Sequence, residues 1–386
     1  SRYIVDNGSA GIYDAIGLFN HPPPLTVWLG VTGSFAGENL RLFAFLMRLP
    51  AIVADFGSVL LVWAMSRRYY GDRRAIIGTV VFALSPVLIL VSGFHGNTDP
   101  VFMFVLLATV YALGLKNRIL LGGVLFGLSM WIKIVPVLMI PAFFLWLRSH
   151  RERRRFFGAA LAVVTIGYGY HLIRAPESVL RKVVAYSSPD GIWGIGRIIP
   201  GYESVGRVVA AATITAAAWV ILRPSAPGPE GDRLNALLRA FAVTFLAFLV
   251  VTPGFGVQYL SWLVAPAVFI GLTFNVSYNI LASWFLGAVY AFWSGGWPLD
   301  YADSIDVGPW RGRTIGLELI LCSVLAVTLI VVMRAAVVAE RTNDEPSPIS
   351  PLLRGNPRDS FRLGTSLGVP VQSGSVTSQI SSQRAK

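Results

Sequence analysis

The sequence is poor in charged residues for its length. Asp, Glu, Lys and Arg make up only 13% of its 386 residues, whereas 54% are hydrophobic and the mean hydropathy is +0.63. A soluble domain of this size carries about 25% charged residues. The deficit excludes an ordinary soluble domain and favours a polytopic α-helical membrane protein. Its apolar runs are continuous and do not alternate with polar residues, which argues against a transmembrane β-barrel.

Other signatures are missing as well. The single cysteine, Cys322, lies inside an apolar run, which excludes a disulfide framework and a cysteine metal site. There is no Walker loop, no dinucleotide-binding motif, no HExxH and no ligand cluster with metal spacing. These absences remove ATP-driven pumping within this chain and disfavour a cytoplasmic nucleotide-sugar. We expect no bound cofactor, and we identify no metal ligand, although a requirement for a divalent metal stays open.

The net charge of +12 would suit a nucleic-acid partner, but its distribution does not. Basic residues gather in short loops at 66–74, 116–118, 148–155 and 223–239, as the positive-inside rule requires of cytoplasmic loops. The loops at 94–100, 173–205, 253–258 and 297–313 then lie on the outer side. Basic residues in 173–205, Arg197 among them, depart from the rule, and an anionic ligand would explain them. The stretch 186–197 is either a lid over a site or a plain connector.

Three regions are expected from the order of these features. Residues 1–49 read as an extracytoplasmic loop region with short helices, residues 50–339 as a transmembrane helical domain, and residues 340–386 as a disordered cytoplasmic tail. The fold class is therefore all-α, with about 11 spans and a range of 10–12. Spans are expected near 50–65, 75–93, 101–115, 119–133, 134–147, 156–172, 206–222, 236–252, 259–275, 279–296 and 314–334.

One polar break stands between two of these apolar runs, at Phe94–Pro100. Polar groups at membrane depth are costly unless they face water. Asp99 can accept a proton or bind a cation, and His95 can hold a phosphate or shuttle a proton. Helix capping by the pair Asp99–Pro100 is the structural alternative, but it leaves His95 and Asn97 unexplained.

Other polar residues recur near the predicted outer face. His21 stands among three prolines, in a stiff turn that either is purely structural or presents an imidazole at the membrane surface. Lys133 ends a span, where it either snorkels or meets a lipid phosphate. Gln258 and Tyr259 begin a span, as part of an interfacial belt or as substrate contacts. Asp55 lies within a span at a cost of about 2.5–3.5 kcal/mol and should have a structural partner.

Five pieces together resemble one family. They are Asn20-His21-Pro22-Pro23 after Ile12-Tyr13, Arg48-Leu49-Pro50 leading to Asp55, His95-Gly96-Asn97-Thr98-Asp99, Lys133-Ile134-Val135-Pro136 with Pro141, and Gln258-Tyr259 with Trp262 and Pro266. In this order, over about residues 12–270, they resemble the GT-C glycosyltransferases, polytopic membrane enzymes that take sugars from polyprenyl-phosphate carriers. The mannosyltransferase and glucosyltransferase branches are the most similar.

The resemblance implies roles for particular residues. The family places a catalytic Asp in its first outside loop, and in related sequences that Asp precedes the stretch similar to Gly11–Asp14. It would then lie upstream of Ser1, and the chain, which starts without Met, would be a fragment or processed product that is incomplete as an enzyme. Asp6 and Asp14 are the substitutes within this loop. The catalytic set predicted is Asp99, His95 and Asp14, and the substrate-binding set is Asn97, His21, Lys133, Gln258, Tyr259 and Arg197.

The function implied is transfer of a hexose, mannose in the first place, from a polyprenyl-phosphate carrier to a lipid or glycan acceptor on the outer face. The partners are membrane lipids, this donor and the acceptor, with no nucleic acid and an undefined oligomeric state. The protein would lie in the plasma membrane of a prokaryote or the endoplasmic reticulum of a eukaryote. The alternative is a non-enzymatic transporter or a lipid-linked glycan flippase, which should show paired half-helices or an inverted repeat. No internal repeat is visible in the sequence.

Overall fold

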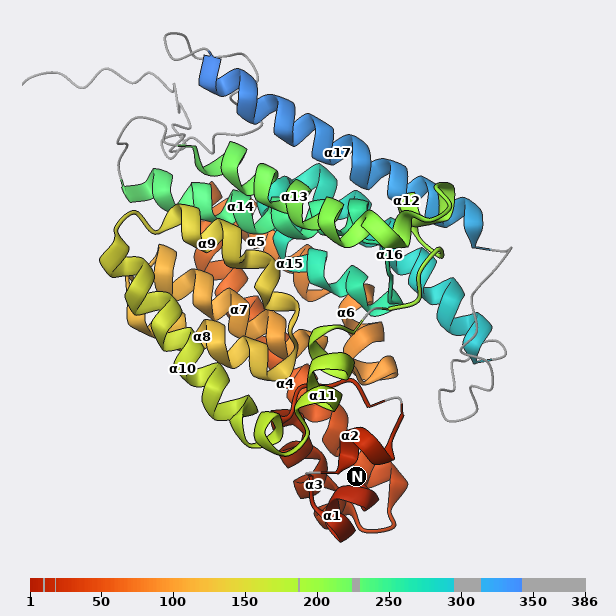
Figure 1. Cartoon of the computed structure of the whole chain (residues 1–386). Helices are drawn as coiled ribbons and strands as arrows, with labels where there is room; N and C mark the ends of the chain where they lie inside the picture. The colour runs from red at the N-terminus through yellow and green to blue at the C-terminus, as the bar shows by residue number, and fades with distance from the viewer. Residues whose placement is uncertain (10, 18, 187, 224–229, 295–313, 342–386) are drawn as a thin grey trace, which may run out of the picture. The chain divides into compact units, whose positions relative to one another are not determined.

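The structure is a computed structural model of the chain. It describes residues 1–341 apart from 10, 18, 187, 224–229 and 295–313 (Figure 1). The predicted tail beyond residue 341, the linker at 224–229 and the whole loop at 297–313 therefore lie outside the described residues.

The described part of the chain is helical, and its one β contact is an isolated bridge between Asp190 and Gly254. The elements are α1 (Arg2–Asn7), α2 (Ile12–Ala15), α3 (Pro24–Ala36), α4 (Leu40–Tyr70), α5 (Asp72–Ala83), α6 (Pro86–Leu88), the π-helix η1 (Ile89–His95), α7 (Asp99–Gly114), α8 (Ile119–Ile132), the 3₁₀ helix η2 (Val135–Met139), α9 (Ile140–Trp146), α10 (His150–Arg174), α11 (Pro176–Val179), the π-helix η3 (Leu180–Val184), α12 (Gly194–Ile198), α13 (Tyr202–Leu222), α14 (Glu230–Val251), the 3₁₀ helix η4 (Val257–Leu260), α15 (Ser261–Ile270), α16 (Leu272–Trp293) and α17 (Ile315–Arg341).

Seven helical segments are long and apolar enough to cross a membrane. They are Leu40–Tyr70, Asp72–His95, His150–Arg174, Tyr202–Leu222, Arg233–Val251, Leu272–Trp293 and Ile315–Val338. Four shorter apolar segments, Asp99–Gly114, Ile119–Ile132, Val135–Trp146 and Val257–Ile270, stand between them. Each segment corresponds to one span expected from the sequence, which confirms an all-α, multi-pass membrane protein.

The first span begins earlier than expected. α4 starts at Leu40 and continues through Pro50, where the span was predicted to begin, so the expected boundary between residues 49 and 50 lies inside a helix. The side chain of Asn39 caps this helix by accepting a hydrogen bond from the backbone N–H of Leu42 at 3.0 Å. Arg41 and Arg48 interrupt the apolar pattern of its first turns, which conceals the helix in the sequence.

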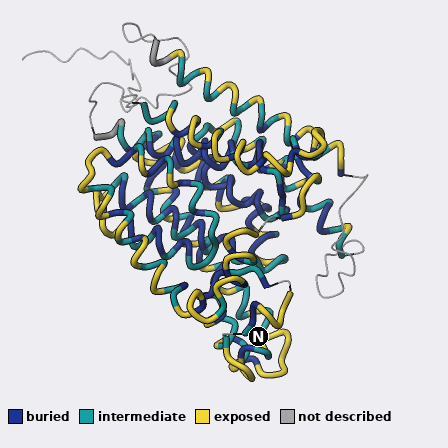
Figure 2. Tube along the Cα trace, viewed as in Figure 1, coloured by how far each residue is buried: buried dark blue, intermediate teal, exposed yellow. Residues whose placement is uncertain are grey.

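The core runs through the middle helices. Every residue of α15 from Ser261 to Phe269 is buried. α10 and α17 instead carry many exposed residues along their length (Figure 2). On α4 the exposed side chains include Val53, Phe56 and Leu60, which share one helical face. Apolar side chains exposed in this way suit contact with lipid hydrocarbon.

Helix ends next to the predicted inner loops contact one another, as the distribution of basic residues predicts. At the predicted inner end, Arg239 donates to the Tyr69 hydroxyl at 3.1 Å, and Trp146 donates to the Arg233 carbonyl at 3.0 Å. At the other end the N-terminal segment packs on the end of α10 and on η3, in an apolar cluster that includes Tyr13 and Tyr168. The turn that carries His21 is thereby brought next to the helix ends that hold the polar break.

Candidate functional site

The polar break folds as a wide turn. η1 ends at His95, and Gly96 takes the left-handed conformation, with φ 68°. The N–H groups of Gly96 and Asn97 both return to the Val91 carbonyl, the second at 3.2 Å. A side chain at position 96 would be strained by this backbone and would meet Arg48 Cγ at 3.2 Å. The turn reverses the chain between His95 and Asp99.

Asp99 is fully buried, and both of its carboxylate oxygens are held. Oδ1 forms an ion pair with Lys133 Nζ, and Oδ2 accepts a hydrogen bond from Trp262 Nε1 at 2.8 Å. The interpretation of Asp99 as a helix cap is wrong: Thr98 occupies the cap position of α7, and the Asp99 side chain turns to Lys133 and Trp262 instead. The Asn97 side chain accepts from the Asp99 backbone N–H at 3.1 Å.

Lys133 is the more exposed partner of the ion pair with Asp99. It ends α8, and its side chain is 16% exposed, whereas that of Asp99 is 0% exposed. Its Nζ also lies 3.5 Å from Asn97 Oδ1 and 5.9 Å from the centre of the Trp262 ring. Lys133 is therefore held by partners and does not simply snorkel, and its ammonium group bridges a buried anchor and the molecular surface.

Two histidines flank Lys133. The His95 Nδ1 atom lies 2.7 Å from the hydroxyl of Tyr290, a fully buried residue of α16. The His21 carbonyl accepts a hydrogen bond from the Tyr13 hydroxyl at 2.7 Å, which fixes the proline-rich turn. Burial, followed by the nearby charge of Lys133, lowers the pKa of His21 from 6.5 to about 4. His21 is consequently neutral at pH 7.

The predicted residues Gln258 and Tyr259 lie in η4, and they differ in how they contact the rest of the site. The Tyr259 ring stacks on Trp262 with centroids 3.9 Å apart, and its hydroxyl forms a hydrogen bond with Ser188. Tyr259 is 9% exposed and so lies in the core, not in an interfacial belt. Gln258 is partly buried, and its amide group folds over Gly256, where a Cβ atom would meet its Nε2 at 2.7 Å. The structure thus brings Tyr259 to the Asp99 anchor through Trp262.

Asp14 and Arg197 lie apart from the ion pair. Asp14 is exposed on α2 and accepts a hydrogen bond from the Ser178 hydroxyl at 2.5 Å. Its neighbour Tyr13 connects it to the site, since the Tyr13 hydroxyl donates to the His21 carbonyl. Arg197 Nε lies 2.9 Å from Glu318 Oε1 of α17, and the Glu318 side chain is only 1% exposed. This ion pair joins α12 to α17 and does not reach Lys133 in the structure.

Within the stretch 186–197, the segment around Trp193 is packed against the core, whereas Tyr186 is 46% exposed. Trp193 is 1% exposed, stacks on Phe255 with centroids 3.9 Å apart, and donates to the Leu249 carbonyl at 2.8 Å. The Phe255 N–H donates to the Pro189 carbonyl at 3.1 Å. These contacts give the segment around Trp193 the packing of a fixed wall rather than that of an open lid.

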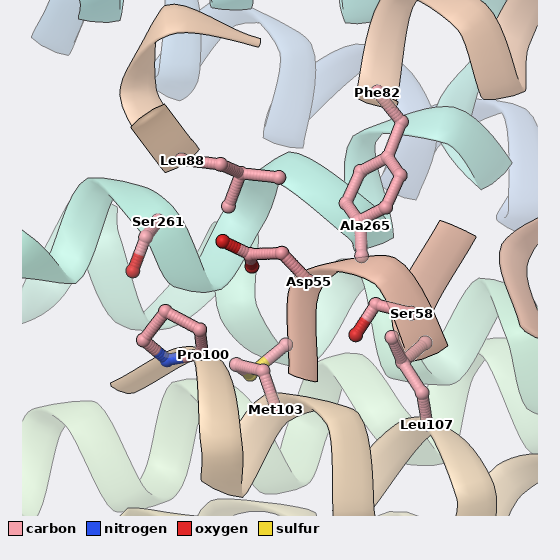
Figure 3. Close-up of a pocket in the computed structure, with 9 residues that line it drawn as sticks. All are labelled: Asp55, Ser58, Phe82, Leu88, Pro100, Met103, Leu107, Ser261 and Ala265. Carbon is pink, nitrogen blue, oxygen red and sulfur yellow. The ribbon is translucent and has the colours of Figure 1, made fainter. Parts of the chain in front are cut away.

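Asp55 has the structural partner that its position requires. Ser92 of η1 donates a hydrogen bond to Asp55 Oδ2, so a helix-to-helix hydrogen bond satisfies this carboxylate, as predicted. Beside it is a small cavity between α4, α7 and α15 (Figure 3). Its lining consists of Asp55, Ser58, Phe82, Leu88, Pro100, Met103, Leu107, Ser261 and Ala265.

Some residues of the site carry no local signal in the sequence. Tyr290 and Trp262 reach His95 and Asp99 from 195 and 163 residues away, and each occupies an apolar span that reads as ordinary core. Trp262 belongs to one of the family motifs given above, but the sequence pattern assigns it no role at the site. Among the described residues, no group of three or more His, Cys, Asp or Glu side chains could hold a metal ion.

Comparison with known proteins places this site in context. Residues 21–175 match the family described as dolichyl-phosphate-mannose-protein mannosyltransferase. The matched segment contains His21, His95, Asn97, Asp99 and Lys133.

Two relatives illustrate the similarity. An undecaprenyl phosphate-alpha-4-amino-4-deoxy-L-arabinose arabinosyl transferase of Pseudomonas aeruginosa (strain UCBPP-PA14) is 32% identical over 160 residues, which cover 37% of this chain and 28% of that protein. GPI mannosyltransferase 1 of Saccharomyces cerevisiae is 28% identical over 134 residues, which cover 34% of this chain and 32% of that protein. The aligned part of the chain thus spans about a third of the length of these relatives or less. The resemblance to the GT-C membrane glycosyltransferases that the motifs indicate is confirmed through residues 21–175, which match the dolichyl-phosphate-mannose-protein mannosyltransferase family.

Proposed function

We propose that this chain is a membrane glycosyltransferase, or the membrane-embedded part of one, that uses a polyprenyl-phosphate sugar. The sugar we propose is a hexose, mannose first, transferred to a lipid or glycan acceptor at the outer face. The observation that carries the proposal is Lys133, a cation anchored by a buried carboxylate at the mouth of the polar break. The names of the matching family and relatives, which include both mannose and an aminoarabinose, support a polyprenyl-phosphate donor and leave mannose as the first candidate.

The charges of the site suit a phosphate held at a membrane surface. Lys133 contributes a positive charge, the buried Asp99 carboxylate orients it, and His21 is neutral at pH 7. The Lys133 ammonium group lies at the more exposed end of this ion pair, in surroundings where low dielectric strengthens electrostatic attraction. A polyprenyl tail dissolves in lipid, so its phosphate sits at the interface, where Lys133 is partly exposed.

The predicted residues have different roles in the proposed reaction. The acceptor hydroxyl attacks the anomeric carbon, a new carbon–oxygen bond forms, and the bond to the carrier phosphate breaks. Lys133 stabilises the charge that develops on the departing phosphate. Because both oxygens of Asp99 are held, we assign Asp99 to the orientation of Lys133 and not to proton removal. We assign removal of the acceptor proton to Asp14, the exposed carboxylate among the catalytic candidates, although Asp14 lies apart from the ion pair and accepts a hydrogen bond from Ser178.

His95 has a separate task in this scheme. Its ring is oriented by the Tyr290 hydroxyl and stands beside the turn that carries Asn97. We assign it to a hydrogen bond with the phosphate or the sugar, which complements the charge of Lys133. Gln258 and Tyr259 form the neighbouring wall, and Arg197 contributes to structure through Glu318.

The test is transfer of labelled mannose from polyprenyl-phosphate-mannose by the protein in lipid vesicles, with a donor carrying 4-amino-4-deoxy-L-arabinose as the comparison. Lys133→Gln should lower transfer by about 10²-fold, the loss typical of one charge-stabilising group. Arg67→Gln, at the exposed inner end of α4, is the matched control and should leave transfer unchanged. Preference for the arabinose donor would correct the sugar alone. Movement of labelled lipid across the vesicle without any sugar transfer would support the flippase and overturn this proposal.

A further inference from the structure

The π-helix η1 needs support from outside itself. Its wide turns pack less efficiently than those of an α-helix, and such segments are usually short and lie at functional positions. η1 ends at His95, so the carbonyls of its last residues have no partner further along the helix. At membrane depth, an unpaired carbonyl costs several kcal/mol. The shape of this turn therefore depends on the groups that α4 supplies.

Arg48 of α4 meets this need at the end of η1. Its Nε donates to the Gly93 carbonyl at 2.7 Å, and an Nη atom donates to the Phe94 carbonyl at 3.1 Å. The other Nη atom donates to the Ala44 carbonyl in its own helix at 3.0 Å. All three nitrogens of the guanidinium group are engaged, so its orientation is fixed from both helices. The planar fork of arginine suits this double contact, which lysine cannot reproduce.

Asp55 holds the same turn at a second point. It follows Arg48 by seven residues on α4, which is about two helical turns and therefore the same face. It accepts a hydrogen bond from the Ser92 hydroxyl. Arg48 and Asp55 of α4 therefore form hydrogen bonds with three successive residues of η1: Ser92, Gly93 and Phe94. The cavity beside Asp55 means that apolar packing does not enclose this carboxylate completely (Figure 3).

We propose that Arg48 and Asp55 are positioning residues that set the geometry of the site by holding η1. His95 directly follows these three residues, and Asp99, which pairs with Lys133, follows four residues later. A shift of the turn would move the imidazole away from Tyr290 and would move Asn97 away from Lys133. This inference rests on the proposed function for its effect on turnover, but the clamp itself is a property of the fold.

The first experiment measures the clamp without reference to activity. Amide hydrogen exchange is followed in lipid nanodiscs for wild type, Arg48→Gln, Ser92→Ala and the control Arg41→Gln, which changes an exposed arginine of the same helix. Arg48→Gln should accelerate exchange in residues 89–97 by about tenfold or more, the expected effect of removing the arginine partner of the Gly93 and Phe94 carbonyls. Ser92→Ala, the milder change, should accelerate the same segment less, and Arg41→Gln should change nothing. Unchanged exchange at 89–97 in Arg48→Gln, or equal acceleration through all of α7, overturns the clamp; if Arg48→Gln does not fold, Ser92→Ala decides by the same criterion.

The second experiment separates positioning from substrate binding. If Arg48 acts through the turn, Arg48→Gln lowers kcat for sugar transfer about tenfold and changes KM by less than twofold. Arg48→Lys keeps the charge but not the fork, so it should recover only part of kcat. Full recovery by Lys, or a loss confined to KM, would show that charge or direct binding matters and would overturn positioning. Wild-type protein without transfer activity would defeat the proposed function, and the exchange experiment would then decide the clamp alone.

Discussion

The ion pair between Lys133 and Asp99 permits a quantitative prediction. Lys133→Met removes the cation but keeps most of the side-chain volume, so the Asp99 carboxylate remains buried with only the Trp262 hydrogen bond. Removing one partner of a buried ion pair costs about 3–5 kcal/mol, because the remaining charge is uncompensated. We therefore expect the free energy of unfolding of Lys133→Met to fall by about 3–5 kcal/mol.

The double variant provides the decisive comparison. In Lys133→Met with Asp99→Asn no charge is left unpaired, and the Asn carboxamide oxygen still accepts from Trp262. Its loss of stability should be smaller than the sum of the two single losses by about 2 kcal/mol or more, within the range of coupling for residues in contact.

The assay is reversible unfolding of the purified protein in mixed detergent micelles, with the free energy extrapolated to zero denaturing detergent. The ion pair between Arg67 and Asp72 serves as the control, since its side chains are 47% and 71% exposed. Arg67→Gln should cost at most about 1 kcal/mol. Single losses at Lys133 and Asp99 that are as small as this control, or that add in the double variant, would refute the reasoning.

Further predictions follow from neighbouring contacts. His95→Ala should reduce sugar transfer by about 10²-fold or more, measured as initial rate in vesicles, whereas near-wild-type transfer would remove His95 from the site. The pKa of His21 lies at about 4 in the folded protein and 6.5 in the unfolded chain, so the unfolded chain binds more protons between these values. Stability should therefore fall as pH drops from about 6.5 towards 4, and His21→Gln should flatten this part of the stability–pH curve. Arg197→Gln removes a cationic partner from the buried Glu318 carboxylate and should lower the free energy of unfolding by about 1–3 kcal/mol with KM unchanged, whereas a raised KM in a stable protein would return Arg197 to the substrate site.

The sequence predicted the helices well because the determining signal is local. A run of apolar residues long enough for lipid specifies a helix regardless of its neighbours, and every expected span corresponds to an observed apolar helix. The start of α4 was misplaced because Arg41 and Arg48 break the apolar run, although Arg48 has its partners on η1. A charged residue near the start of a helix does not mark the helix boundary when a contact with another helix satisfies its charge.

Part of the site could also be predicted, because some of its residues stand out in the local sequence pattern. His95, Asn97 and Asp99 stand out because polar residues between apolar runs demand an explanation, and Lys133 stands out as a cation at a span end. The pairing of Asp99 with Lys133 and Trp262 depends on contacts across 34 and 163 residues, which no local pattern encodes. The same limit applies to Arg197, whose partner Glu318 lies in the last described helix.

The contacts of Arg48 have a consequence for how this protein tolerates substitution. Arg48 recognises the main-chain carbonyls of positions 93 and 94, and every amino acid has such a carbonyl. The side chain of Phe94 can therefore change without loss of the contact, whereas position 96 must keep a left-handed backbone close to the arginine stem. In a saturation library, Arg48 and Gly96 should be the intolerant positions, and Gly93, where an added Cβ atom meets nothing within 4 Å, a permissive one, whereas Phe94 is constrained by its own packing on Tyr290, with ring centroids 5.0 Å apart.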